Sequence, residues 1–215
     1  MEVGAGAEAD ARRGPVVAGL VLAAGAGRRM GGPKALLRLA PAGRTMVEEA
    51  IAALVEGGCE PVIAVVGAAA ERVGALADAS GAVVVVEPGW AEGMGASLRA
   101  GLAAADAVGC EALLVDLVDL PDVGRDVVRR LVSAAGDEPA ASLVRAAYGG
   151  VPGHPVLIGR DHWAGVAAVA EGDSGARRYL ADHDARTVEC GDIGSGRDLD
   201  RPADIWRAEP LTGRP

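Results

Sequence analysis

The sequence predicts a Rossmann-like α/β domain, in which a mostly parallel sheet lies between two layers of helices. Short apolar runs rich in β-branched residues alternate along the chain with segments of helical periodicity. The 215 residues suit one domain with a proper core, and neither a repeat nor a linker marks a second one. We therefore expect the domain at 15–208, between a disordered tail at 1–14 and a flexible tail at 209–215.

The first predicted strand is the apolar run 16–23, which a glycine-rich loop follows. A short extended piece is expected at 35–39. Thr45 and Glu48 form a capping-box start for a helix that the Gly57-Gly58 pair ends. Later strands are expected at 61–67, 82–87, 111–117, 141–148 and 186–190. Later helices are expected at 69–79, from the segment 93–102, at 123–134, from 162, around Tyr179, and from Pro202.

Composition excludes several classes of function. The net charge of −9 argues against a general binder of nucleic acid or of anionic membranes, because both partners require a basic face. No apolar run reaches the roughly 18 residues that a membrane span needs. Cys59, Cys110 and Cys190 are odd in number and widely spaced, which indicates neither a disulfide framework nor a zinc site. With an N-terminus that lacks an apolar signal region, these features predict a cytoplasmic protein.

The loop after the first strand carries the strongest functional signal. The stretch 20–34 reads LVLAAGAGRRMGGPK, and its glycines allow several backbone N–H groups to point into one concavity that suits an anion. Arg28, Arg29 and Lys34 follow at once and suit phosphate oxygens. The loop is not a Walker loop, because it lacks the closing Gly-Lys-Ser/Thr sequence, and its glycine spacing does not match a dinucleotide-binding fingerprint. The alternative is an ordinary glycine-rich turn with solvated basic residues.

Two further segments point to the same edge of the sheet. Ser97 lies in the first turns of a helix, where free N–H groups favour anions, although it could also simply cap that helix. Asp119 follows a buried strand, where open α/β sheets bind ligands, and would suit Mg²⁺. Asp116 is a second candidate for the metal. The alternative is that Asp119 or Asp122 caps the next helix.

The pattern LAAGxGxRMGxxK closely resembles the nucleotidyltransferases of the molybdenum cofactor cytidylyltransferase type, a MobA-like family of NTP transferases. The resemblance spans roughly 16–208 and implies a fold of the nucleotidyltransferase and glycosyltransferase-A type. It places Ser97 beside the base and makes Asp198 a second metal ligand with Asp119. Catalytic roles fall to Arg29, Lys34 and Asp119. The implied nucleotide-binding residues are Leu22, Ala23, Ala24, Gly25, Gly27, Arg28, Arg29, Lys34 and Ser97.

The acceptor side of the resemblance involves two later segments. Gly153-His154-Pro155-Val156 and the segment around Asp173 resemble the family's acceptor region, so His154 and Asp173 become acceptor-binding candidates. His154 could instead be structural, and Asp173 or Ser174 could cap a helix. Asp200 is explained by capping a final helix at Pro202. One departure is Val118, where the family often has glycine before the metal-binding aspartate.

The function implied is Mg²⁺-dependent transfer of a nucleoside monophosphate from an NTP, CTP by resemblance, to a phosphorylated acceptor, molybdopterin by resemblance, with release of pyrophosphate. A molybdenum enzyme is a possible partner. Trp90 is the aromatic residue nearest to the base-side loop in the sequence. Two alternatives stay open: an NAD(P)H-dependent oxidoreductase of the nicotine-blue reductase type, and a non-catalytic nucleotide-binding chaperone of a molybdenum enzyme.

Overall fold

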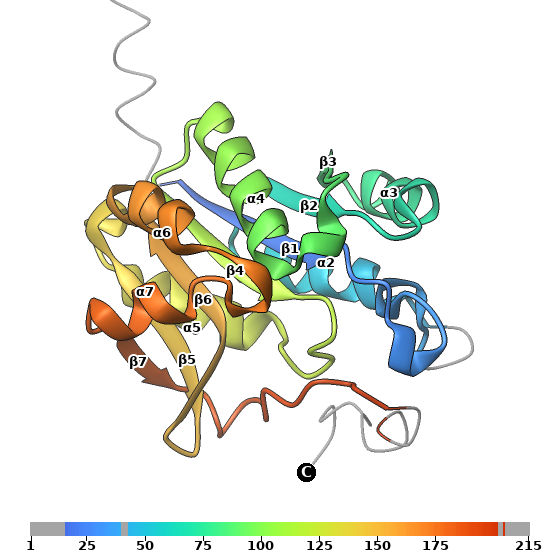
Figure 1. Ribbon diagram of the computed structural model, residues 1–215. Helices are drawn as coiled ribbons and strands as arrows, with labels where there is room; N and C mark the ends of the chain where they lie inside the picture. Colours follow the sequence, from blue (N-terminus) through green and yellow to red (C-terminus); the bar gives the residue numbers. More distant parts are fainter. Residues whose placement is uncertain (1–15, 40–42, 202–203, 205–215) are drawn as a thin grey trace, which may run out of the picture.

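The computed structural model describes residues 16–39, 43–201 and 204. The predicted tails at 1–14 and 209–215, and nearly all of the final helix expected from Pro202, lie outside these residues. Seven strands form one sheet in the order β3-β2-β1-β4-β6-β5-β7 (Figure 1). The strands are β1 (Val17–Ala23), β2 (Val62–Val66), β3 (Val83–Val86), β4 (Ala112–Leu117), β5 (Leu143–Tyr148), β6 (Val151–Gly159) and β7 (Arg186–Glu189).

The sheet is mostly parallel, as predicted. β1 pairs in parallel with both β2 and β4, and β3 and β7 add in parallel at the two edges. β6 is antiparallel to its neighbours β4 and β5. The chain moves from β1 outward to β3 and then crosses back to β4, so the order reverses between β1 and β4. Open α/β sheets bind ligands at such a switch point.

Helices cover both faces of the sheet and complete three layers (Figure 1). The apolar side chains of α2 (Met46–Gly57), α3 (Ala70–Ala79) and α5 (Arg125–Ala135) pack on one face. Those of α4 (Met94–Val108), α6 (Trp163–Val169) and α7 (Arg177–Asp182) pack on the other. Single 3-10 turns lie at Arg28–Met30, Lys34–Leu36, Trp90–Glu92, Pro139–Ala141, Arg160–His162 and Gly172–Ser174.

The core is built from aliphatic side chains, because the chain contains no Phe. All seven residues of β1 are buried, and apart from Gly19 their side chains alternate between the two core clusters. Burial on both faces explains why the central strands read as continuous apolar runs. Cys59, Cys110 and Cys190 are buried free thiols. Among the described residues, no helix is long and apolar enough to cross a membrane.

Most local predictions are confirmed, and some are wrong. The Thr45 backbone N–H donates to the Glu48 carboxylate at 2.7 Å, completing the predicted capping box. The extended piece expected at 35–39 is wrong in its first part, where Lys34–Leu36 form a 3-10 turn closed by the bond from the N–H of Leu37 to the carbonyl of Lys34. Its second part is extended, and Arg38 forms an antiparallel bridge with Thr45. The N-caps of α5 and α7 are Gly124 and Ala176. The capping roles considered for Asp119, Asp122, Asp173 and Ser174 are therefore wrong.

Candidate active site

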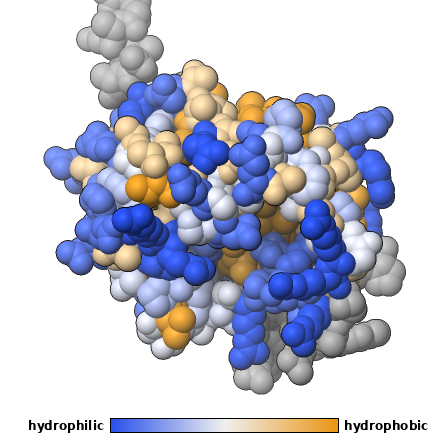
Figure 2. Space-filling view, viewed as in Figure 1, coloured by the Kyte–Doolittle hydropathy of each residue, from blue (hydrophilic) through white to orange (hydrophobic). Residues whose placement is uncertain are grey.

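A cavity of about 480 Å³ opens at the carboxyl ends of β1 and β4, at the switch point. Figure 2 shows a recess on this face of the molecule, with apolar residues at its floor and hydrophilic residues along its lower rim. Three segments surround the cavity: the glycine-rich loop after β1, the start of α4 and the end of β4. The lining residues are Leu22, Ala24, Gly25, Ala26, Gly27, Arg28, Arg29, Lys34, Trp90, Ala91, Gly93, Met94, Ser97, Leu117, Val118, Asp119, Asp173 and Asp200.

The glycine-rich loop depends on the conformation of Gly27. Its φ of 56° is left-handed, and a Cβ at this position would lie 1.9 Å from the carbonyl oxygen of Gly32. The Gly27 carbonyl accepts hydrogen bonds from the N–H groups of Met30, at 2.8 Å, and Gly32, at 3.2 Å. This tight turn brings Arg28 and Arg29 to the cavity wall, with the Arg29 side chain 82% exposed. Arg29 Nη1 also lies 4.0 Å from Asp200 Oδ2, at the edge of ion-pair distance. The turn thus presents two guanidinium groups at the cavity wall, where a bound anion could contact them.

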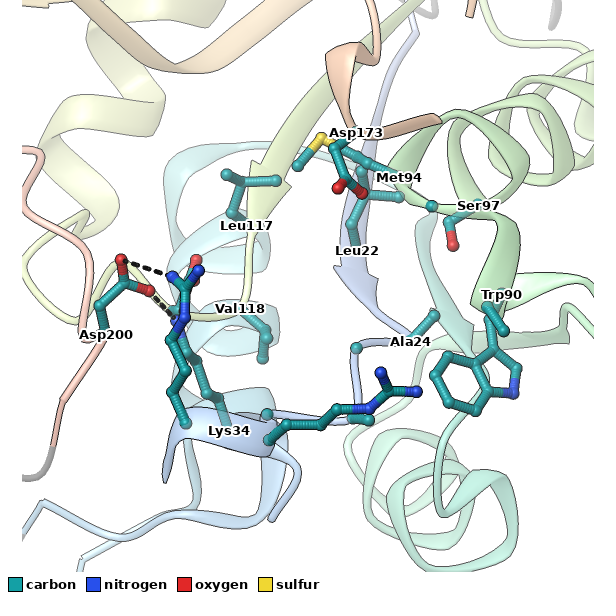
Figure 3. A pocket seen from close by; sticks show the side chains of 18 residues that line it. Leu22, Ala24, Lys34, Trp90, Met94, Ser97, Leu117, Val118, Asp173 and Asp200 are labelled. Atoms are coloured by element: carbon teal, nitrogen blue, oxygen red, sulfur yellow. Dashed lines mark hydrogen bonds and ion pairs between the residues drawn. The ribbon is translucent and has the colours of Figure 1, made fainter. Parts of the chain in front are cut away.

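Lys34 joins the loop to two carboxylates. Its Nζ donates to Asp119 Oδ2 at 2.9 Å and to Asp200 Oδ1 at 2.7 Å (Figure 3). Partial burial by itself would lower the pKa of the Lys34 ammonium, but the hydrogen bonds to the two aspartates raise it overall. The hydrogen bond and charge of Lys34 hold the pKa of Asp200 below its usual value. Lys34 is therefore a charged bridge between two segments far apart in sequence.

A third carboxylate completes the group. One oxygen each from Asp119, Asp198 and Asp200 lie within 4.8 Å of one another. The N–H of Leu199 donates to the Asp119 backbone carbonyl at 3.0 Å, which ties this late segment to the end of β4. Clustered carboxylates together with substrate phosphates are the usual means by which proteins hold Mg²⁺. The donor set of this carboxylate trio thus fits a divalent cation.

The opposite wall of the cavity is formed at the start of α4. Ser97 is 4% exposed and lines the cavity, with Trp90 nearby on the same side (Figure 3). Gly93 has a φ of 120°, and a Cβ there would lie 2.5 Å from the carbonyl carbon of Gly172. Only a glycine permits this approach, which brings Asp173 over the cavity. The wall combines an aromatic ring, a hydroxyl and a helix N-terminus.

His154 lies beside the cavity rather than on its wall. It is half-buried on β6, and its backbone carbonyl accepts a hydrogen bond from the Tyr148 hydroxyl at 2.8 Å. Burial lowers the pKa of His154 to about 4, and the neighbouring Arg145 adds to this effect while the charge of Asp119 opposes it. The imidazole is consequently neutral near pH 7.

The structure brings together most of the residues proposed from the sequence and separates a few. Leu22, Ala24, Gly25, Gly27, Arg28, Arg29, Lys34, Ser97, Asp119 and Asp173 all line the cavity. The side chain of Ala23 packs in the core instead. Asp116 is buried away from the carboxylate trio, so its candidacy as a metal ligand is not supported. The side chain of Val118 packs mainly into the core and borders the cavity.

Asp200 is the main residue that sequence reasoning missed. The sequence predicts only a capping role for Asp200, whereas in the structure its carboxylate bonds to Lys34 and lines the cavity. The Asp-x-Asp spacing of Asp198 and Asp200 was the available signal, because residues two apart in an extended segment point to the same side. Met94, which also lines the cavity, had no comparable signal.

The glycine-rich loop shares one cavity with Asp119 and Asp200, and the exposed Asp198 lies beside these two carboxylates outside the cavity lining. This arrangement at the switch point of the sheet, together with the family match, defines an enzyme of the nucleotidyltransferase class. The model of the MobA-like NTP transferase domain matches residues 19–187. The chain belongs to this family, as the resemblance in the sequence predicted.

The chain is also similar to two characterised relatives. Nicotine blue oxidoreductase from Paenarthrobacter nicotinovorans is 38% identical over 203 residues, covering 90% of this chain and 96% of that protein. Molybdenum cofactor guanylyltransferase from Rhodobacter capsulatus is 32% identical over 158 residues, covering 68% of this chain and 65% of that protein. The names of these two relatives describe different reactions.

Solved structures agree in fold. Rv0371c from Mycobacterium tuberculosis, in a complex with manganese, is 26% identical with a TM-score of 0.69, covering 89% of this chain and 96% of that one. A nucleotidyl transferase from Methanothermobacter (Mth528) is 24% identical with a TM-score of 0.74, covering 90% of this chain and 96% of that one. The predicted nucleotidyltransferase-type fold is confirmed.

Proposed function

We propose that this protein is a Mg²⁺-dependent enzyme that transfers a nucleoside monophosphate from an NTP, CTP in our assignment, to a phosphorylated acceptor of the molybdopterin type. The observation that carries the proposal is the carboxylate trio, two members of which, Asp119 and Asp200, bond to Lys34 and line one cavity together with the glycine-rich loop. The same residues would serve another NTP equally well, so the choice of CTP and of the acceptor rests on family resemblance. We expect the enzyme to act in the cytoplasm.

Different residues of the cavity would bind different parts of the NTP. The glycine-rich loop would bind the phosphates through backbone N–H groups and Arg28, while the base would lie near Ser97 and Trp90. Asp119 and Asp198, joined by Asp200, would hold the divalent cation. When bound, the cation would neutralise charge on the phosphates. Arg29 and Lys34 would stabilise the charge that develops on the leaving oxygens.

The chemistry then requires little more than positioning. An oxygen of the acceptor phosphate forms a bond to the α-phosphorus, and the bond from that phosphorus to the bridging oxygen breaks in line. Pyrophosphate leaves with the bonding electron pair. The attacking phosphate is already ionised, so no protein base is needed, and the site accordingly derives its effect from orientation and electrostatics.

Lys34 also sets a condition for assembly of the site. Its ammonium now bonds to two of the carboxylates that would bind the cation. Arrival of an NTP offers the ammonium phosphate oxygens as alternative partners, and this exchange would release Asp119 and Asp200 toward the cation. We therefore expect nucleotide and cation to bind cooperatively.

A second candidate function is NAD(P)H-dependent reduction. It is favoured by the 38% identity with nicotine blue oxidoreductase over 90% of this chain. The two functions differ in their requirements, because hydride transfer needs NADH or NADPH and no divalent cation. A non-catalytic chaperone of a molybdenum enzyme would bind nucleotide without turnover.

A thermal-shift panel tests these proposals. CTP, GTP, ATP, UTP, NADH and NADPH are each added with and without Mg²⁺ or Mn²⁺ to the wild type, to Asp119→Asn and to Asp126→Asn. Asp126 is a matched control, because it is an exposed aspartate on α5 that pairs with Arg129. A ligand at 100 times its Kd stabilises by about 2.7 kcal/mol, which is readily measured.

A cation-dependent shift with one NTP, lost in Asp119→Asn and kept in Asp126→Asn, supports the transferase and identifies its nucleotide. A shift with NADH or NADPH alone, indifferent to the cation and to Asp119, contradicts it and supports the reductase. Release of pyrophosphate with molybdopterin, measured by a coupled inorganic-pyrophosphatase assay, then distinguishes the enzyme from a chaperone.

A further inference from the structure

Arg145, Arg177 and His154 form a basic group on the β6 side of Asp119, because the charges of both arginines and of Asp119 act on His154. Arg145 is on β5, and its neighbours in sequence, Val144 and Ala146, pack on the α2 and α5 face. Side chains alternate along a strand, so Arg145 lies on the other face, which α4, α6 and α7 cover. Its partner across the strands is Val156 of β6, which packs on that same face.

The strand register relates this group to the end of β4. Val115 of β4 pairs antiparallel with Val156 of β6. Two residues beyond this pair come Leu117, which lines the cavity, and His154. The charge of Asp119, two residues after Leu117, also reaches His154. The basic group and the glycine-rich loop thus lie on opposite sides of the β4 end.

The Arg145 guanidinium has no partner among the described residues. Its Nε is buried and makes no hydrogen bond, and no described carboxylate lies within 4.0 Å of Arg145 or of Arg177. Burial lowers the pKa of Arg145, and the neighbouring charge of Arg177 lowers it further. By contrast, Arg130 forms a bidentate pair with Asp192 at 2.5 and 2.8 Å.

A half-buried cation without a counter-ion, crowded by a second cation, is costly unless an anion joins it. Two guanidinium groups present forked donors that match the oxygens of a phosphate. A neutral His154 contributes a further N–H donor without adding charge. The chemistry of the group is therefore that of a site for a phosphate or a similar dianion.

We propose that Arg145, together with Arg177 and His154, forms a subsite that binds the phosphate group of the acceptor. The assignment of this subsite to the acceptor rests on the proposed nucleotidyl transfer. The proposal that the subsite binds a dianion does not depend on that function. The subsite places the acceptor phosphate on the β6 side of Asp119, facing the NTP held on the β1 side. Arg145 acts here as a binding residue that selects anionic acceptors.

Isothermal titration with inorganic phosphate tests the subsite in the nucleotide-free protein. The variants are Arg145→Gln, the more exposed Arg177→Gln in case the first folds poorly, and Arg178→Gln as a matched control. Arg178 is the next residue on α7 and lies near Asp182 instead, at 3.9 Å. The variant Arg29→Gln shows whether a phosphate-binding event in the titration belongs to the glycine-rich loop, because such an event would be weakened in this variant.

We expect Arg145→Gln and Arg177→Gln to weaken one phosphate-binding event about ten-fold or more, because each removes a charge-assisted contact. Arg178→Gln should match the wild type. Unchanged binding in both Arg145→Gln and Arg177→Gln, an equal loss in Arg178→Gln, or no saturable binding by the wild type would overturn the proposal. The nucleotide panel is read separately, so a failure of NTP binding removes the transferase but leaves this result intact.

Discussion

Asp116 provides a quantitative test of the strand beneath the active site. Its side chain lies on β4 in a residue that is 1% exposed, and its Oδ1 has no partner among the described residues. Burial raises the pKa of Asp116 to about 8, and the charges of Asp119 and Asp122 contribute in the same direction. We predict that Asp116→Asn, which keeps the shape but removes the charge, makes stability less dependent on pH.

The sign follows from proton binding. The folded protein keeps the Asp116 carboxyl protonated up to about pH 8, whereas the unfolded chain ionises it near 3.8. Between these values the folded state binds more protons, so stability falls as the pH rises. Each pH unit in the window costs about 1.4 kcal/mol, so this one group removes about 2.7 kcal/mol between pH 5 and pH 7. For a chain of this size that corresponds to a fall in Tm of about 5 to 10 °C.

Thermal unfolding from pH 5 to pH 8 measures the effect in the wild type, in Asp116→Asn and in Asp106→Asn. Asp106 serves as the control because its side chain on α4 is 72% exposed. The Tm of Asp116→Asn relative to that of the wild type should increase as the pH rises, whereas the Tm of Asp106→Asn should change with pH as that of the wild type does. Parallel profiles for all three proteins would refute the argument that Asp116 is buried in its neutral form.

Three further predictions concern the cavity and its supports. Lys34→Met should strengthen Mn²⁺ binding to the nucleotide-free protein, measured by electron paramagnetic resonance, because the ammonium no longer competes for two carboxylates; weaker binding would show that Lys34 only supports the fold. Trp90→Leu should abolish the quenching of tryptophan fluorescence by bound nucleotide and weaken nucleotide binding by about 1–3 kcal/mol. The buried Trp163 provides an internal reference for the fluorescence, and undiminished quenching would show that the base does not bind beside Trp90. Glu48→Ala should cost about 1 kcal/mol in urea unfolding through loss of the capping box, and no change would mean that packing alone sets the start of α2.

The sequence determined features that depend on neighbours along the chain. The apolar runs specified the central strands because both faces of these strands are buried. Thr45 and Glu48 specified the start of α2 because a capping box is closed within four residues. The glycine-rich loop could be predicted for the same reason, because local hydrogen bonds from Met30 and Gly32 to the carbonyl of Gly27 close its turn.

Only the tertiary structure decided which distant groups meet. Lys34 and Asp200 are 166 residues apart, and no local pattern indicates that their side chains bond at 2.7 Å. The antiparallel insertion of β6 between β4 and β5 likewise depends on pairing across the sheet, and this pairing sets Arg145 opposite Val156, two residues from His154 and next to the end of β4. Spacing along the chain encodes turns, caps and strand faces, whereas charge pairing and the joining of loops into one site depend on how the whole chain packs.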